Sequence, residues 1–281
     1  EMGLIATLEG RFWDAESYSE EALALRKELG DPALIAEATI HLAGAAYTLG
    51  NFNQVKRLAN TVWELRSEYQ QPVLLGFTSA LWGILHIAQG QLEEGVANFE
   101  DAVDALTKTG YQRECMRIQG YLILVLILQG RLERAERLCL EDLDQIDSTG
   151  ARQFRCYRLT GLGMINSARQ SYTKAKTYLQ QAVVEGVEIG MKPAAIDALQ
   201  NLASQIIARR DPEVALAWLT MVVHHPASDA FQKQTAQQAA EQLAEQLPVK
   251  RVEAARERGR HLTLNEIAAE IRSKRREPCQ I

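Results

Sequence analysis

Apolar residues recur at three- and four-residue spacings along most of this chain, which is the spacing of one buried face of an α-helix. Between positions 32 and 69 two such stretches follow each other with a short break. They predict one helix from about Pro32 to Leu49 and a second from about Asn53 to Tyr69. The predicted core positions are Ile35, Ala38, Leu42, Ala45, Ala46 and Leu49, followed by Val55, Leu58, Ala59, Val62 and Leu65.

Local signals mark the ends of the first helix. Asp31 can accept hydrogen bonds from the free amides of the first turn, and Pro32 suits that turn. Gly50 predicts the end, because a residue without a side chain adopts the left-handed conformation at little cost. Small residues, Ala43 and Ala59, are expected to face each other, so that the two helix backbones approach closely.

A turn pattern repeats every 40 residues: a glycine, any residue, an aromatic residue or leucine, two residues, then a small or apolar one. A second glycine series lies halfway between these turns. Two turns per period, each a helix length apart, predict a repeated helical hairpin and an all-α fold without strands. The copies are Gly10-Phe12-Ala15, Gly50-Phe52-Val55, Gly90-Leu92-Gly95 and Gly130-Leu132-Ala135, then the worn Gln170-Tyr172-Ala175 and Arg210-Pro212-Ala215.

The turn resembles that of the tetratricopeptide repeat, in which Gly-x-aromatic-x-x-Ala joins helix A, before the glycine, to helix B, after it. The resemblance implies a right-handed superhelix, an α-solenoid of about six 40-residue hairpins with a C-terminal capping helix. The usual repeat has about 34 residues, so each helix is slightly longer here. HEAT and armadillo repeats have this longer period but lack the turn, so the tetratricopeptide interpretation is favoured. Small-to-large pairs support close packing of A on B: Gly83 with Phe99 and Gly163 with Leu179.

Both ends of the chain are similar to one narrower class. Residues 21–31 resemble the end of helix B in the repeat arrays of large bacterial signal-transduction ATPases, the STAND class, and of related transcription regulators. Residues 254–268 resemble the closing segment of the same proteins. The resemblance implies a C-terminal sensor region, with the ATPase domain of the parent chain upstream. This sequence contains no ATPase module.

The repeat predicts two regions. Residues 1–247 are expected to form the array, which starts in the middle of a repeat, and residues 248–281 the C-terminal capping helices and a basic tail. Thr263 and Glu266 fit a capping box that opens a last helix ending near Arg276. Residues 250–277 contain nine Lys or Arg and five Asp or Glu, a local net charge of +4.

Composition restricts the classes of partner. Of the 281 residues 47% are apolar and 24% charged, and the net charge is −5, so nucleic acid is not an expected partner. No apolar run approaches the roughly 18 residues of a membrane helix, so no membrane partner is expected. The four cysteines, Cys115, Cys139, Cys156 and Cys279, form no Cys-x-x-Cys pair, which favours reduced thiols and a cytoplasmic location.

The common catalytic motifs are absent from the sequence, including the phosphate-binding Gly-x-x-x-x-Gly-Lys loop and the Gly-x-Ser-x-Gly elbow. We therefore expect no enzymatic activity, no catalytic residue and no cofactor. Gly161 and Gly163 are interpreted as helix-packing residues. The pair His224-His225 is interpreted as a helix end before Pro226, and no metal site is expected because no acidic residue or cysteine lies at ligand spacing.

The family resemblance implies which helix A positions line the concave face. Aromatic and aliphatic residues with a central arginine in a groove are typical of a binding surface. The alternative is that other parts of the protein cover them. These positions are Glu37, His41, Tyr47, Phe77, Leu81, Ile84, Arg117, Tyr121, Leu124, Tyr157, Met164, Asp197 and Asn201.

The function predicted from the sequence is non-catalytic binding of a protein, a peptide or a small inducer by this concave face, as the sensor of a STAND-type regulator. A free-standing scaffold that assembles protein complexes is the alternative. The clamp that recognises chaperone tails in this family needs Lys and Asn where Ile40 and Gly44 stand, so an adaptor for chaperone tails is disfavoured.

Overall fold

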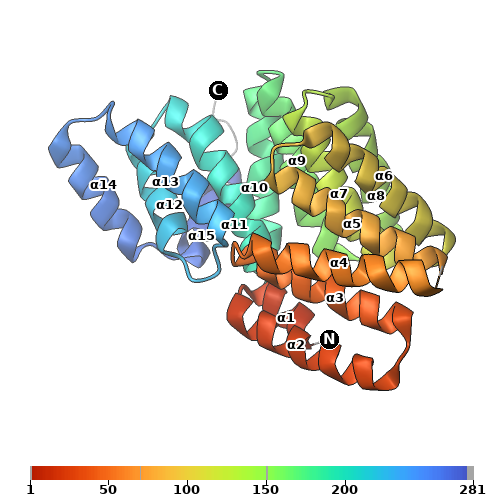
Figure 1. Ribbon diagram of the computed structural model, residues 1–281. Helices are drawn as coiled ribbons and strands as arrows, with labels where there is room; N and C mark the ends of the chain where they lie inside the picture. The colour runs from red at the N-terminus through yellow and green to blue at the C-terminus, as the bar shows by residue number, and fades with distance from the viewer. Residues whose placement is uncertain (1, 70, 150, 277–281) are drawn as a thin grey trace. The chain divides into compact units, whose positions relative to one another are not determined.

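The computed structural model describes residues 2–69, 71–149 and 151–276, and in these residues the chain is all-α, without strands, as predicted (Figure 1). The helices follow one another through short turns, which is consistent with an α-solenoid. Their bounds are α1 Met2–Glu9, α2 Phe12–Leu29, α3 Pro32–Thr48, α4 Phe52–Tyr69, α5 Pro72–Ala88, α6 Leu92–Lys108, α7 Gln112–Leu128, α8 Leu132–Thr149, α9 Arg155–Ala168, α10 Tyr172–Glu188, α11 Lys192–Asn201, α12 Pro212–His224, α13 Ala230–Ala244, α14 Val249–His261 and α15 Leu264–Arg276.

Two places depart from regular α-helix. A 3-10 turn, Arg152–Phe154, precedes α9. After α11 the chain continues as a π-helical turn, Leu202–Ile206, and a 3-10 turn, Ile207–Arg209. The second irregularity lies in the most worn copy of the repeat, where Asp211 and Pro212 replace the usual turn and start α12.

The chain forms two compact units. Unit 1 comprises the described residues of 1–7 and 11–138, and unit 2 those of 8–10 and 139–281, so the division falls within α8 and also assigns the last two residues of α1 to unit 2. The sequence predicts a different boundary, between an array of residues 1–247 and a C-terminal region of residues 248–281. In unit 2, α14 packs on α12, where a side chain on Gly259 would come within 2.4 Å of the Ala217 carbonyl oxygen. The described helices beyond residue 248 therefore contribute side chains to the core of unit 2, among them Ala255 and Ile267.

The predicted helix ends are confirmed in unit 1. α3 begins at Pro32, and the Asp31 Oδ1 accepts hydrogen bonds from the amides of Ala33, at 2.8 Å, and Leu34, at 3.3 Å. Gly50 has a φ of 77°, in the left-handed region, where α3 ends. The two predicted helices match α3 and α4 to within one residue at each end.

The turn has the same closing hydrogen bond in successive copies. The amide that follows the left-handed residue donates to a carbonyl five residues earlier, as from Asn51 to Ala46 at 2.8 Å. Ser171 makes the same bond to Asn166 at 2.8 Å, although Gln170 has replaced the glycine. Gln170 keeps the left-handed conformation, with a φ of 60°. The turn geometry therefore persists where its preferred residue has been lost.

Small residues bring helices A and B together, as predicted. A β-carbon on Gly83 would lie 2.6 Å from the Phe99 ring, and one on Gly163 would lie 2.5 Å from Leu179. Phe99 and Leu179 are fully buried. The space beside each glycine is thus occupied by the large side chain of the next helix.

Unit 2 also contains a buried ion pair. The Arg158 Nε donates to the Asp142 Oδ2 at 2.5 Å, and the two residues are 1% and 0% exposed. The other Asp142 oxygen, Oδ1, is buried and has no hydrogen-bond partner among the described residues. Burial raises the pKa of Asp142, and the neighbouring Arg158 opposes that rise.

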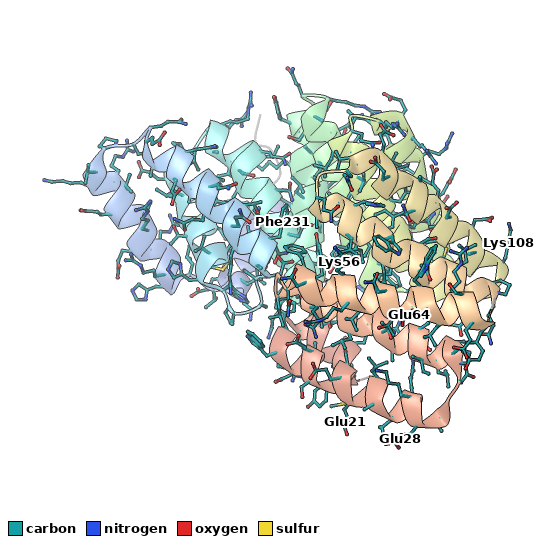
Figure 2. The ribbon with its side chains drawn as sticks, viewed as in Figure 1. Glu21, Glu28, Lys56, Glu64, Lys108 and Phe231 are labelled. Carbon is teal, nitrogen blue, oxygen red and sulfur yellow. The ribbon has the colours of Figure 1, made fainter. Side chains whose placement is uncertain are left out.

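The last helix begins with the predicted capping box. The Thr263 hydroxyl accepts from the Glu266 amide at 3.2 Å, and the Glu266 carboxylate accepts from the Thr263 amide at 2.8 Å. Cys279 and the end of the basic tail lie outside the described residues. Charged side chains such as Glu21 and Glu28 project from the outer side of α2 (Figure 2). In the described residues, a helix of the length and apolarity that a membrane crossing requires is not found.

Candidate functional site

Three of the predicted binding residues lie in the core. Phe77, Leu81 and Ile84 on α5 are 0%, 0% and 2% exposed, so the expectation that they line an open groove is wrong. The reason is that α5 packs against α3, α4, α6 and α7, and these three side chains lie on its packed faces. The Phe77 ring, for example, meets the edge of the Tyr111 ring at 5.4 Å.

Four other predicted residues of unit 1 are partly exposed: Tyr47, Arg117, Tyr121 and Leu124. The Tyr47 ring contacts the Phe52 ring edge-on at 5.8 Å, and the Tyr121 ring stacks on Phe99 at 5.8 Å. These contacts orient the aromatic rings and leave part of each accessible.

The remaining predicted residues belong to unit 2. Tyr157 is 40% exposed, while Met164 and Asn201 are partly buried. The Asn201 side chain donates to the Asp197 carbonyl at 2.9 Å and accepts from Gln205 at 2.7 Å. Because the predicted set is divided between the two units, a single surface made of all its members stays a prediction.

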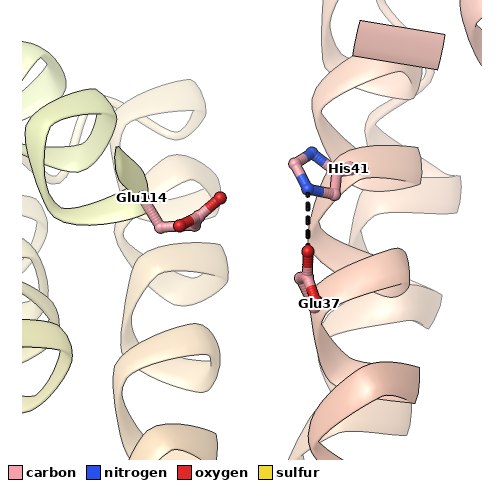
Figure 3. A group of neighbouring side chains, drawn as sticks. All are labelled: Glu37, His41 and Glu114. Carbon is pink, nitrogen blue, oxygen red and sulfur yellow. Dashed lines mark ion pairs between the residues drawn. The ribbon is translucent and has the colours of Figure 1, made fainter. Parts of the chain in front are cut away.

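The strongest concentration of polar chemistry in unit 1 is a charged cluster of five side chains: Arg26 on α2, Glu37 and His41 on α3, and Glu114 and Arg117 on α7. One ligand atom from each of Glu37, His41 and Glu114 lies within 4.8 Å of the others. Figure 3 shows Glu114 reaching toward the other two from its own helix.

The Arg26 guanidinium holds Glu37 in place. Its Nη1 lies 3.1 Å from the Glu37 Oε2 and donates to the Leu34 carbonyl at 3.0 Å. The other carboxylate oxygen, Oε1, lies 3.8 Å from the His41 Nε2 (Figure 3). The contact with His41 and the charge of Arg26 lower the pKa of Glu37, although burial opposes them.

The His41 imidazole has a pKa below its ordinary value, which favours the neutral form. Burial lowers its pKa, and the positive charge of Arg117 adds to that effect, while Glu37 and Glu114 oppose it. A neutral imidazole has a free lone pair on one ring nitrogen.

Arg117 stands beside an open stretch of α3. Its Nη1 is the single side-chain atom within 4 Å of where a β-carbon of Gly44 would be, at 3.8 Å. Its Nη2 is buried and has no hydrogen-bond partner within the described part of the chain. Buried donors in native proteins nearly always have partners, and this nitrogen is an exception in unit 1, as are the Trp82 Nε1 and the Gln129 Nε2.

Sequence reasoning found Glu37, His41 and Arg117 but missed Arg26 and Glu114. The Glu37-x-x-x-His41 spacing was visible in the sequence, because residues four apart share a helix face. Glu114 lies far from both in sequence, and only the stacking of α7 near α3 brings it there.

Histidines and thiols elsewhere in the chain are engaged locally. The His224 Nδ1 lies 2.8 Å from the Thr220 carbonyl oxygen, and the His225 Nδ1 accepts from the Ala227 amide at 3.1 Å, as expected of a helix end. Cys115, Cys139 and Cys156 are buried and are not in disulfides within the described residues, and burial raises the pKa of Cys156 to about 12.

Unit 2 has its own acidic pair. The Asp229 carboxylate caps α13 and accepts from the Gln232 amide at 2.7 Å. Burial, and then the nearby charge of Asp229, raise the pKa of Asp197 to about 7. Asp197 is therefore partly protonated near neutral pH.

Comparison with known proteins shows little. The chain matches no known family model, and its sequence matches no curated protein. Among solved structures it is similar to BtubC (BKLC) from P. vanneervenii, with 16% identity over 96% of this chain and 94% of that chain, and a TM-score of 0.46. A likeness at this level carries no inference about function.

Proposed function

We propose that this chain is a tetratricopeptide repeat array that binds a protein, a peptide or a small inducer without catalysis, as the sensor of a STAND-type regulator. The repeated Gly-x-aromatic turn and the two terminal segments support the family assignment. The helices A of unit 1 carry the binding residues, and the ligand presents a carboxylate or phosphate to Arg117.

One observation carries this proposal: the buried Arg117 Nη2 has no acceptor in the described chain. Arginine binds planar anions through two parallel hydrogen bonds, and it is over-represented among residues that dominate binding energy. Gly44 leaves room beside it, and Tyr47, Tyr121 and Leu124 supply partly exposed apolar surface.

In a STAND-type regulator, binding would act through differential affinity. A ligand shifts an equilibrium between resting and active states only as far as it binds one of them more tightly. A free-standing scaffold would use the same residues to hold a partner and would have no such equilibrium. The upstream sequence of the parent gene distinguishes the two, because only the sensor requires an ATPase domain.

The proposal is tested with immobilised chain and arrays of peptides that carry either a free C-terminal carboxylate or a phosphate. Affinity for the best binder is then measured with Arg117→Ala and Tyr121→Ala. Each should lose roughly 2 kcal/mol, about 30-fold, if it dominates binding. The matched control is Arg57→Ala, an exposed arginine on α4.

Circular dichroism checks that every variant folds. Equal affinity of both variants and the wild type would reject this surface, as would an array in which every binder is insensitive to Arg117. Since the chain lacks a phosphate-binding loop, purified material should also leave ATP unhydrolysed. Turnover that scales with the amount of chain would contradict the non-catalytic assignment.

A further inference from the structure

We propose that Glu37, His41 and Glu114 bind one divalent transition-metal ion in unit 1, through a carboxylate oxygen from each glutamate and a ring nitrogen of the histidine. This inference does not rest on the proposed function. The site would exist whether the chain is a sensor or a scaffold.

The geometry requires only side-chain adjustment. Glu37 and His41 lie one turn apart on the same face of α3, and Glu114 completes the set from α7. The three ligand atoms lie within 4.8 Å of one another, and the Glu37 Oε1 is 3.8 Å from the His41 Nε2. In metal sites with bonds of about 2.0–2.2 Å, neighbouring ligand atoms are roughly 3–4 Å apart.

Glu37 is already oriented for this role. Arg26 contacts its Oε2 at 3.1 Å and is itself tied to the Leu34 carbonyl, so Oε1 is the oxygen directed at His41. Outer contacts of this kind fix the direction of a ligating carboxylate in metalloproteins.

Glu114 distinguishes a metal site from an ordinary ion-pair network. The two guanidiniums and two carboxylates of the cluster balance in charge, and Arg26 is sufficient to pair Glu37. Glu114, however, is partly buried, and in the described residues it makes no hydrogen bond or ion pair. Burying a carboxylate without a partner is costly, and a bound cation would remove that cost. Glu114 is directed at His41 and Glu37, as a metal ligand would be.

The ligand set indicates which ions would bind. One imidazole with two carboxylates suits Mn²⁺, Fe²⁺, Co²⁺ and Zn²⁺, whereas Ca²⁺ and Mg²⁺ prefer oxygen alone. Three protein ligands leave at least one coordination position for water or for an anion. Arg117, three residues after Glu114 on α7, would favour an anion there.

The test uses the full chain, freed of metal with a chelator and titrated with Mn²⁺ by electron paramagnetic resonance and with Co²⁺ by visible absorption. We expect one saturable site. His41→Ala and Glu114→Gln should each weaken binding by roughly 10–100-fold or more, since altering even an outer partner costs that much.

The chain offers a matched control. On α14, Glu257 and His261 have the same i, i+4 spacing, with the His261 Nε2 3.0 Å from the Glu257 Oε1, but among the described residues no third ligand joins them. His261→Ala should leave the affinity unchanged. Circular dichroism checks folding, and Glu114→Gln, which keeps the side-chain volume, serves if His41→Ala does not fold.

Three results would overturn the proposal. In the first, neither Mn²⁺ nor Co²⁺ shows saturable binding to the wild type. In the second, binding to the Glu114→Gln protein is as tight as to the wild type. In the third, His261→Ala abolishes binding. An affinity that disappears with both His41→Ala and Glu114→Gln but survives His261→Ala supports it.

Discussion

At the scale of single residues, two aspartates, Asp142 and Asp197, differ in whether a cationic side chain lies beside them. Asp142 is fully buried with an arginine, and Asp197 is partly buried near a second aspartate. Asp142 has a cationic partner, and Asp197 has none within the described part of the chain. Their substitution should therefore change stability in opposite directions.

Asp142→Ala should destabilise the protein by about 3–5 kcal/mol, because Arg158 would stay buried without its carboxylate. Urea unfolding followed by circular dichroism measures this. Asp104→Ala is the control, since it removes the exposed partner of Lys108 and should cost about 1 kcal/mol or less.

A double substitution separates a lost partner from lost packing. Asp142→Leu with Arg158→Met replaces both charges by apolar groups and should recover most of the loss. If the double variant is as unstable as Asp142→Ala, the cost comes from altered packing and not from an uncompensated charge.

Asp197→Asn should stabilise the protein at high pH. The folded-state pKa of about 7 lies above the ordinary 3.8, so the folded state binds the extra proton and stability falls as pH rises from about 4 to 7. The penalty is complete above pH 7 and at most about 4 kcal/mol; the partial exposure of Asp197 reduces it.

Thermal unfolding at pH 4 and at pH 8 tests this prediction. The wild type and Asp197→Asn should agree near pH 4 and differ at pH 8, where the variant is more stable. Asp101→Asn, at an exposed position, should show no such divergence. Equal stability of Asp197→Asn and wild type at pH 8 would contradict the raised pKa.

At the scale of helices and turns, most of the structure could be predicted, because its determinants are local. Asp31, Pro32 and Gly50 set the ends of α3 by themselves, and the Thr263–Glu266 box sets the start of α15. The exposure of helix A residues could not be predicted in the same way. Phe77 is covered by helices that come before and after α5 in the chain. Its burial therefore depends on the neighbouring repeats, and not on its position within the repeat that contains it.

Gln170→Gly should stabilise the protein by about 0.5–1 kcal/mol. Gln170 is the one non-glycine residue with positive φ in the described chain, and glycine adopts this conformation without a steric penalty. Gln89→Gly is the control, because this exposed residue has a φ of −93° and should lose about as much. A lower denaturation midpoint for Gln170→Gly would contradict the left-handed turn.

Two glycines within helices A should respond in opposite ways to alanine. Gly83→Ala would place a β-carbon 2.6 Å from the Phe99 ring and should cost about 1–3 kcal/mol. Gly44→Ala meets only the Arg117 Nη1 at 3.8 Å and should gain about 0.5–1 kcal/mol from better helix propensity. If the urea midpoints of the Gly83→Ala and Gly44→Ala variants shift in the same direction, the close contact between α5 and α6 at Gly83 is rejected.

At the scale of the whole molecule, the 40-residue period predicted the order of the helices, because each copy repeats the same local signals. It did not predict the division within α8 or the meeting of Glu114 with Glu37 and His41. Those features depend on contacts between successive hairpins, which the local signals within one copy do not specify.

Stacking of this kind also predicts which helices a destabilising substitution affects. When each hairpin contacts mainly its neighbours, stability is a sum of local terms, and parts of the chain open separately. Gly83→Ala should lower amide protection from exchange mainly in α5 and α6. Gly163→Ala, whose β-carbon would lie 2.5 Å from Leu179, should do so mainly in α9 and α10.

Hydrogen exchange followed by mass spectrometry measures both variants against the wild type at the same pH and temperature. Gly44→Ala serves as the control, because it creates no close contact and should lower protection nowhere. If either destabilising variant instead lowers protection equally in every helix of both units, the chain unfolds as one cooperative block. The local, neighbour-by-neighbour account of its stability would then be wrong.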